Sequence, residues 1–122
     1  MDNTAVRPDS LLELREALRR FAADREWEPF HTPKNLAMAL AGEAGEVIEH
    51  FQWLTAEQSS ALPAPVRAEV AHELADVLLY LVRLADVLDI DLADAARTKM
   101  AINADRYPVA RARGSAKKYD EL

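Results

Sequence analysis

Two pairs of acidic residues carry the most distinctive chemistry in this sequence. Glu43 and Glu46 stand three residues apart, and so do Glu73 and Asp76. Residues with this spacing share one face of a helix, so two such helices packed together would direct four carboxylates at one point. Like charges at close range raise one another's pKa and destabilise the fold. The pattern therefore predicts a metal site for a hard divalent ion, and Mg²⁺ is the usual choice where phosphates are bound.

Two other interpretations of these acids stay open at this level. Acidic pairs are common in helical proteins, where they form solvated faces. Glu69 and His72 also suggest a second alternative, a carboxylate-bridged di-iron bundle. That site needs Glu-x-x-His on two helices, and this chain has one such pair. Glu43 falls within the apolar sector of its helix and Asp76 lies inside an apolar run, where an unpaired charge is costly. This placement favours the metal.

Two glycines stand beside the first acid pair. Gly42 and Gly45 fall in the interior of the expected helix, where each costs about 1 kcal/mol relative to Ala. Such a cost indicates the close approach of a ligand or of another backbone, unless the positions are simply tolerant.

Aromatic and basic residues form two further candidate groups. Trp27 and His31 fall in a connector, and Trp53 ends the helix that carries the first acid pair. Core packing is the default for such residues, but flat rings beside a metal also suit a nucleobase. The basic group shares one face of a later helix and is either solvated or binds phosphates. Its members are Lys99, Asn103 and Arg106.

Hydrophobic periodicity and helix-start signals predict an all-α chain. Helices are expected over 10–26, 33–53, 65–88 and 92–107, with a short turn of helix from Thr55 and no strand. Four helices with short links predict a four-helix bundle-like subunit. We expect a single domain over 1–122, with a flexible arm at 1–9 and a basic tail at 109–122.

Composition limits the possible functions. The chain has no cysteine, which excludes thiolate catalysis and cysteine-based zinc sites. A net charge of −6 makes binding to a nucleic-acid polymer unfavourable, although a single nucleotide remains possible. The sequence shows neither a signal peptide nor a membrane-length apolar run, so we expect a cytoplasmic protein that does not bind membranes.

The order of several motifs resembles the all-alpha nucleoside triphosphate pyrophosphohydrolases, the MazG-like family, and within it the dCTP pyrophosphatase branch. The motifs are Trp27-Glu28-Pro29-Phe30-His31, Gly42-Glu43-Ala44-Gly45-Glu46, Phe51-Gln52-Trp53, Glu73-Leu74-Ala75-Asp76, Lys99-Met100-Ala101-Ile102-Asn103, Arg106-Tyr107-Pro108 and Lys118-Tyr119. Ala101 departs from that branch, which usually carries Asp there, but Lys99 and Asn103 are in place. The resemblance covers the chain from about Leu11 to Leu122.

This resemblance implies roles for three groups of residues. The acids are implied to be catalytic and to bind Mg²⁺, with one of them acting as general base. A second group lines the base pocket, and a third reaches the phosphates or lies near the site in the tail. The acids are Glu43, Glu46, Glu73 and Asp76. The base-pocket residues are His31, Trp53, Trp27 and Tyr80. The residues near the phosphates or in the tail are Lys99, Asn103, Lys118 and Tyr119.

The expected function is that of an Mg²⁺-dependent nucleoside triphosphate pyrophosphohydrolase. The resemblance implies cleavage of a (deoxy)nucleoside triphosphate, dCTP or a modified dCTP, to the monophosphate and pyrophosphate, in cleansing of the nucleotide pool. It also implies a homodimer or homotetramer with sites between subunits. The alternative is a non-catalytic helical oligomerisation or binding module whose acids are surface charges.

Overall fold

Side-chain caps set where four of the helices begin. The computed structural model describes residues 10–122. At each of these four starts, a side-chain oxygen accepts a hydrogen bond from the backbone N–H three residues further on, which satisfies one of the free donors of the first turn. The capping residues are Ser10, Thr32, Thr55 and Asp91. These are the starts that the sequence predicts.

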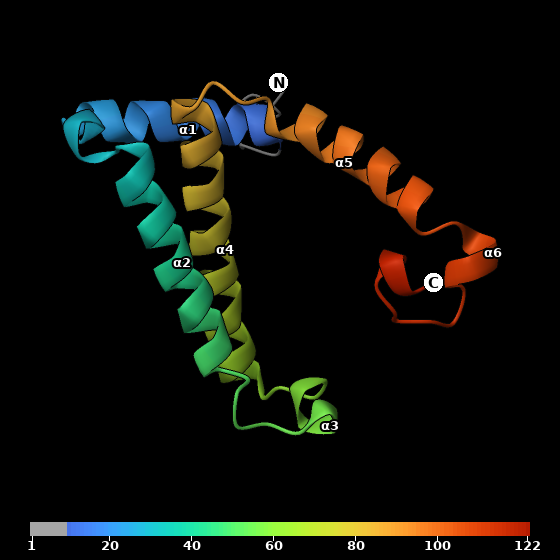
Figure 1. Ribbon diagram of the computed structural model, residues 1–122. Coiled ribbons are helices and arrows are strands. Elements are labelled where there is room, and N and C mark those ends of the chain that lie inside the picture. The colour runs from blue at the N-terminus through green and yellow to red at the C-terminus, as the bar shows by residue number, and fades with distance from the viewer. Residues whose placement is uncertain (1–9) are drawn as a thin grey trace, which may run out of the picture. The chain divides into compact units, whose positions relative to one another are not determined.

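The chain divides into two compact units, one ending at Ile90 and the other spanning Asp91–Leu122. The first unit contains α1 (Leu11–Asp24), the 3₁₀ helix η1 (Glu28–Phe30), α2 (Pro33–Glu49), α3 (Ala56–Ser59) and α4 (Ala64–Val87). The long helices α2 and α4 lie side by side, and α1 crosses their end (Figure 1). This unit contains both acid pairs, on α2 and on α4.

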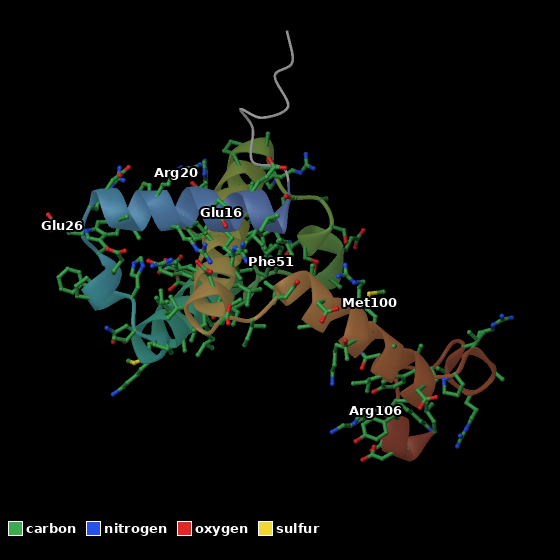
Figure 2. All side chains as sticks on the ribbon, turned by 90° about the horizontal axis from the view of Figure 1, so that it is seen from above. Glu16, Arg20, Glu26, Phe51, Met100 and Arg106 are labelled. Carbon is green, nitrogen blue, oxygen red and sulfur yellow. The ribbon has the colours of Figure 1, made fainter. Side chains whose placement is uncertain are left out.

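The second unit contains α5 (Leu92–Arg106), α6 (Val109–Ala112) and the 3₁₀ helix η2 (Tyr119–Glu121). Met100 and Arg106 extend from α5 (Figure 2), and 71% of Met100 is exposed. The ring of Tyr119 lies edge-on to Tyr107, and the Arg106 guanidinium stands 4.6 Å from its centroid. The sequence did not predict α6 or η2, which fall within its basic tail.

Helix content confirms the all-α class. The structure shows no strand in residues 10–122, and no helix there is long and apolar enough to cross a membrane. The single domain remains a prediction, and the arm at 1–9 lies outside the described residues.

Two helix ends differ from the predicted boundaries. The first helix ends at Asp24 rather than 26, and Glu26 adopts the left-handed conformation with φ 54°. The second ends at Glu49 rather than 53. Beyond it, the amide of Phe51 donates to the carbonyl of Ile48, a three-residue spacing that tightens the chain into a turn.

The described core is small for the number of apolar residues. Its fully buried hydrophobic residues are Ala22, Leu36, Val70, Val82 and Ala85. The predicted apolar face of α4 is only partly covered, because within the unit that helix packs mainly against α2 and α1. Its large exposed residues include Leu74, Leu78 and Leu81. Much apolar surface of α4 is thus left uncovered by the described residues of the unit, 10–90.

Candidate metal centre and nucleotide pocket

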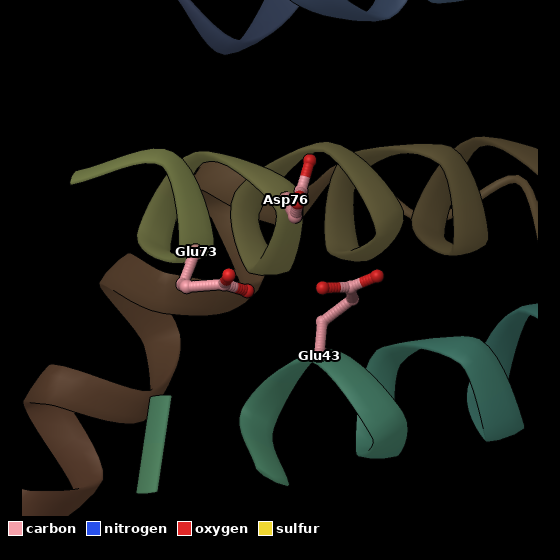
Figure 3. Close-up of side chains that lie close together, drawn as sticks. All are labelled: Glu43, Glu73 and Asp76. Atoms are coloured by element: carbon pink, nitrogen blue, oxygen red, sulfur yellow. The ribbon is translucent and has the colours of Figure 1, made fainter. Parts of the chain in front are cut away.

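Three carboxylates converge between α2 and α4. Figure 3 shows Glu43 on α2 facing α4, from which Glu73 and Asp76 project. One oxygen from each carboxylate lies within 4.8 Å of the others. Glu43 is placed there by the pairing of the two longest helices, and the three-residue spacing puts Glu73 and Asp76 on adjoining turns of α4.

Glu46, the fourth predicted acid, is exposed and does not belong to this group of three. The charge of Glu49 raises the pKa of Glu46 most, followed by a hydrogen bond between the two side chains. Glu49 was not among the predicted site residues. The signal that marks it is the continued spacing of three from Glu43 through Glu46 to Glu49.

Electrostatics in the group favour a cation. Partial burial raises the pKa of Glu43, and the charges of Asp76 and Glu73 raise it further. A bound divalent ion would relieve that repulsion, and a donor set of carboxylate oxygens alone suits hard ions such as Mg²⁺ or Ca²⁺. These residues therefore fit a metal.

The three carboxylates are partly buried. No charged residue among residues 10–122 is fully buried, and Asp76 is partly buried where it lines the cavity described below. The physical reason is the incomplete cover of α4 within the unit. Partial burial and repulsion between the carboxylates together are the reason to infer a cation here.

A cavity of about 160 Å³ lies beside the carboxylates, where α1, η1 and α4 meet. Its wall is largely aromatic and aliphatic. The lining residues are Leu18, Phe21, Trp27, His31, Asp76, Leu79, Tyr80 and Arg83. Three predicted base-pocket residues, Trp27, His31 and Tyr80, thus line a single cavity, and Asp76 borders both this cavity and the carboxylate group.

Edge-on ring contacts arrange the aromatic wall. Trp27 stands 5.7 Å from Phe21 and 6.2 Å from His31, measured between ring centroids, with interplanar angles of 71° and 67°. Such contacts stabilise aromatic pairs beyond the area that they bury. They hold Trp27 between two neighbours in the short connector, where the sequence pattern alone specified no geometry.

His31 accepts a hydrogen bond that the sequence did not predict. Arg83 Nε donates to His31 Nδ1 over 3.0 Å, and Arg83 Nη1 donates to Asp86 Oδ2 over 3.3 Å. Asp86 also accepts a pair of hydrogen bonds from Arg19, at 2.8 and 2.6 Å. Burial lowers the pKa of His31, and the Arg83 charge lowers it further. The sequence placed Arg83 only on a polar stripe of its helix.

Trp53 does not line the cavity. It follows α2, whereas His31 precedes it, and 86% of Trp53 is exposed. The 17 residues of α2 span about 25 Å at a helical rise of about 1.5 Å per residue. Trp53 and His31 of one chain therefore stand at opposite ends of a long helix.

Open space surrounds the two glycines of α2. A Cβ atom added at Gly42 or Gly45 would meet nothing within 4 Å. The expected close approach of another backbone is therefore absent within the described part of the chain.

The remaining predicted residues belong to the second unit. Lys99 and Asn103 lie four residues apart on α5 and so share one face. Lys118 precedes η2, and Tyr119 begins it. Their roles toward a phosphate remain predictions.

Known proteins match this chain over most of its length. A family model described as the MazG-like family matches residues 39–122. The chain is 46% identical to dCTP pyrophosphatase 1 of Mus musculus, over 99% of this chain and 76% of that protein. It is 47% identical to dCTP pyrophosphatase 1 of Homo sapiens, over 94% and 69% respectively.

A solved structure shares the fold. The crystal structure of a pyrophosphatase from Archaeoglobus fulgidus superposes with a TM-score of 0.76 at 39% sequence identity. The match covers 80% of this chain and 92% of that one.

Proposed function

Because this chain belongs to the MazG-like family, we propose that it is a nucleoside triphosphate pyrophosphohydrolase. It would cleave a deoxynucleoside triphosphate, dCTP or a modified dCTP, to the monophosphate and pyrophosphate. The names of the similar mouse and human enzymes support this substrate class. The biological role that follows is cleansing of the cytoplasmic nucleotide pool.

One observation supports the proposal most strongly: Asp76 belongs both to the carboxylate group and to the wall of the cavity. A nucleoside triphosphate joins a flat apolar base to a chain of anionic phosphates. A cavity with aromatic walls beside a cation site offers a complementary pair of environments. Neither feature alone would distinguish a nucleotide from other ligands.

The cavity volume favours a pyrimidine. A cavity of about 150 Å³ in another protein holds a benzene ring, which has the same ring size as a pyrimidine. The cavity here, at about 160 Å³, is of that size. The two fused rings of a purine would extend beyond a space of that volume.

The reaction breaks the P–O bond between the α and β phosphates. Water supplies an oxygen to one phosphorus and a proton to the released group, so the products are a monophosphate and pyrophosphate. Glu43, Glu73 and Asp76 would hold Mg²⁺, which when bound polarises the phosphates and offsets their charge. Glu46 lies outside that group of three and has a raised pKa, which suits a carboxylate that accepts a proton from water.

Trp53 enters the proposal through a second copy of the chain. Since His31 and Trp53 of one chain lie at opposite ends of α2, both can line one base pocket only if Trp53 comes from another subunit. The exposed apolar side chains of α4 would be covered in the same assembly. We propose a homodimer or homotetramer with a shared site, in which Lys99, Asn103, Lys118 and Tyr119 contact phosphates.

Pyrophosphate release tests the function. We expect the purified chain with Mg²⁺ to release pyrophosphate from dCTP, and chelation by EDTA to abolish the release. Asp76→Asn should lower turnover by at least about 100-fold, because it removes a charge from the metal group. Asp24→Asn, on the exposed end of α1, is the matched control and should keep full activity.

Two results would contradict the proposal. One is wild-type turnover by a folded Asp76→Asn protein. The other is the absence of any stabilisation of the thermal melt by Mg²⁺ with a non-hydrolysable triphosphate, since a ligand that binds the native state raises the melting temperature. The second result would favour a non-catalytic oligomerisation module.

A further inference from the structure

The hydrogen bond between Arg83 and His31 determines which ring nitrogen carries the proton. A guanidinium only donates hydrogen bonds, so His31 Nδ1, 3.0 Å from Arg83 Nε, must be the unprotonated acceptor. In a neutral imidazole the single N–H then lies on Nε2. The ring is thereby restricted to one of its two tautomers, and Nε2 is left to donate to a ligand.

Arg83 is itself fixed on its other side. Its side chain is 11% exposed, and Nη1 donates to Asp86, whose side chain is 6% exposed. Asp86 is held in turn by two hydrogen bonds from Arg19, on α1. Helices α1 and α4 therefore both anchor the guanidinium. Arg83 cannot swing away from His31 without giving up a nearly buried charge pair.

The ring also stays neutral near neutral pH. Burial lowers the pKa of His31, and the adjacent Arg83 charge lowers it further, so the imidazolium form is disfavoured. An imidazolium would place a hydrogen on Nδ1, against the Arg83 donor. Geometry and charge thus agree on a neutral ring with hydrogen on Nε2.

We propose that Arg83 is a positioning residue that fixes His31 as an Nε2–H donor, and that this donor makes the pocket prefer cytosine over uracil and thymine. Both side chains line the cavity that takes the base in the proposed function, on which this inference rests. Cytosine presents ring N3 and O2 as acceptors, whereas N3 of uracil and thymine carries a hydrogen. A donor directed at ring N3 pairs with cytosine, but it opposes the N3–H of uracil and thymine, whose acceptors O2 and O4 lie on either side of N3.

The test compares Arg83→Met with Arg83→Lys. Met removes the donor, so His31 is free to change tautomer and accept from a uracil N3–H. We expect the ratio of kcat/KM for dCTP over dUTP to fall by about 10-fold. Lys again offers a donor to His31 Nδ1, but it lacks the rigid planar set of donors of a guanidinium, so it should recover part of the dCTP-over-dUTP ratio. Arg67→Met, an exposed position on the same helix away from the cavity, is the matched control and should leave the ratio unchanged.

Nitrogen-15 spectra of the imidazoles read the tautomer directly, with His31 assigned by comparison with His31→Gln. The wild type should show a protonated Nε2 and an unprotonated Nδ1, and Arg83→Met a mixture. A wild-type His31 protonated on Nδ1 would overturn the inference. So would an unchanged dCTP preference in a folded Arg83→Met protein.

These readouts separate this inference from the proposed function. If the wild type cleaves no triphosphate, the proposed function fails, while the nitrogen spectra still test the tautomer. Thermal shifts with α,β-methylene-dCTP and α,β-methylene-dUTP then measure base preference without turnover. Equal shifts by the two analogues in the wild type would overturn the preference for cytosine. Should Arg83→Met not fold, the wild-type nitrogen spectra and the two analogue shifts still decide the tautomer and the base preference.

Discussion

At the scale of single residues, Asp86 helps to order the wall of the cavity. It contacts neither the cavity nor the carboxylate group, yet it holds Arg83 and Arg19 at once. The hydrogen bond from Arg19 holds the pKa of Asp86 below its usual range, and the charges of Arg19, Arg15 and Arg83 add to this effect. A carboxylate with a depressed pKa stabilises the fold wherever it is ionised.

This gives a pH-dependent prediction for Asp86→Asn. At pH 7 we expect the free energy of unfolding to fall by about 1.5–3 kcal/mol, the range for hydrogen bonds to charged groups. The native pKa of Asp86 lies below that of the unfolded chain, so its contribution is complete above a pH of about 4 and is lost as the pH falls further. The difference between wild type and variant should therefore shrink below pH of about 4. Urea unfolding from pH 7 to pH 3, followed by circular dichroism, measures it.

Asp24→Asn is the control for that series. It is an exposed carboxylate on the same unit, so the gap between Asp24→Asn and wild type should be small throughout. A gap for Asp86→Asn that stayed constant down to pH 3 would mean that the ionisation of Asp86 contributes nothing, and that the loss comes from the amide NH2 that Asn places against the arginine donors.

At the scale of elements, α2 contains two glycines in its interior that lower its stability, and no contact among the described residues accounts for them. Gly42 and Gly45 interrupt it, and no atom of residues 10–122 outside that helix's own backbone lies within 4 Å of a Cβ at either position. Glycine inside a helix costs about 1 kcal/mol relative to alanine. Space beside the acids is thus available to something that the single chain does not contain.

Replacing these glycines separates two explanations. If the positions are merely tolerant, Gly42→Ala and Gly45→Ala should each raise the free energy of unfolding by about 0.5–1 kcal/mol and leave turnover unchanged. If substrate or a second subunit packs there, we expect stabilised subunits with a higher KM or impaired assembly. Chemical denaturation, steady-state kinetics and analytical ultracentrifugation on the two variants distinguish these outcomes.

The elements were largely predictable from the sequence, because their signals are local. Capping side chains and helical periodicity act within a few residues, and they placed α1, α2, α4 and α5 to within four residues at each end. The turn after Glu49 was missed because no glycine or proline marks it. The short helices α6 and η2 were missed because each has too few residues to show a period.

The candidate site was less predictable, because it depends on contacts between distant residues. Spacing identified Glu43, Glu73 and Asp76, since two helix faces suffice to bring them together. Spacing did not identify the pairing of His31 with Arg83, which are 52 residues apart.

At the scale of the whole molecule, subunit mixing tests the shared site. Glu43→Gln and Trp53→Ala each damage a different contribution to the pocket, so both variants should be poorly active alone. In a dimer with two shared sites, random exchange at equal amounts restores about a quarter of the sites, because only one site of each mixed dimer receives both intact residues. We therefore expect activity to reappear after mixing and subunit exchange.

Glu43→Gln mixed with Asp76→Asn is the matched control. Both residues belong to the carboxylate group of one chain, so no exchange can rebuild an intact group, and activity should stay absent. Failure of the first mixture to recover, with mixed oligomers demonstrated by native mass spectrometry, would show that each chain forms its own pocket.

If the pocket is shared between subunits as proposed, the position of Trp53, a helix length away from His31, has a consequence for how the enzyme behaves on dilution. A pocket built from two chains exists only while the chains are associated, so the number of pockets follows the law of mass action. Well below the dissociation constant of the assembly, the rate should rise with the square of the protein concentration rather than in proportion to it. A cell would then control hydrolysis of the nucleotide through the abundance of the chain more steeply than a one-chain active site allows.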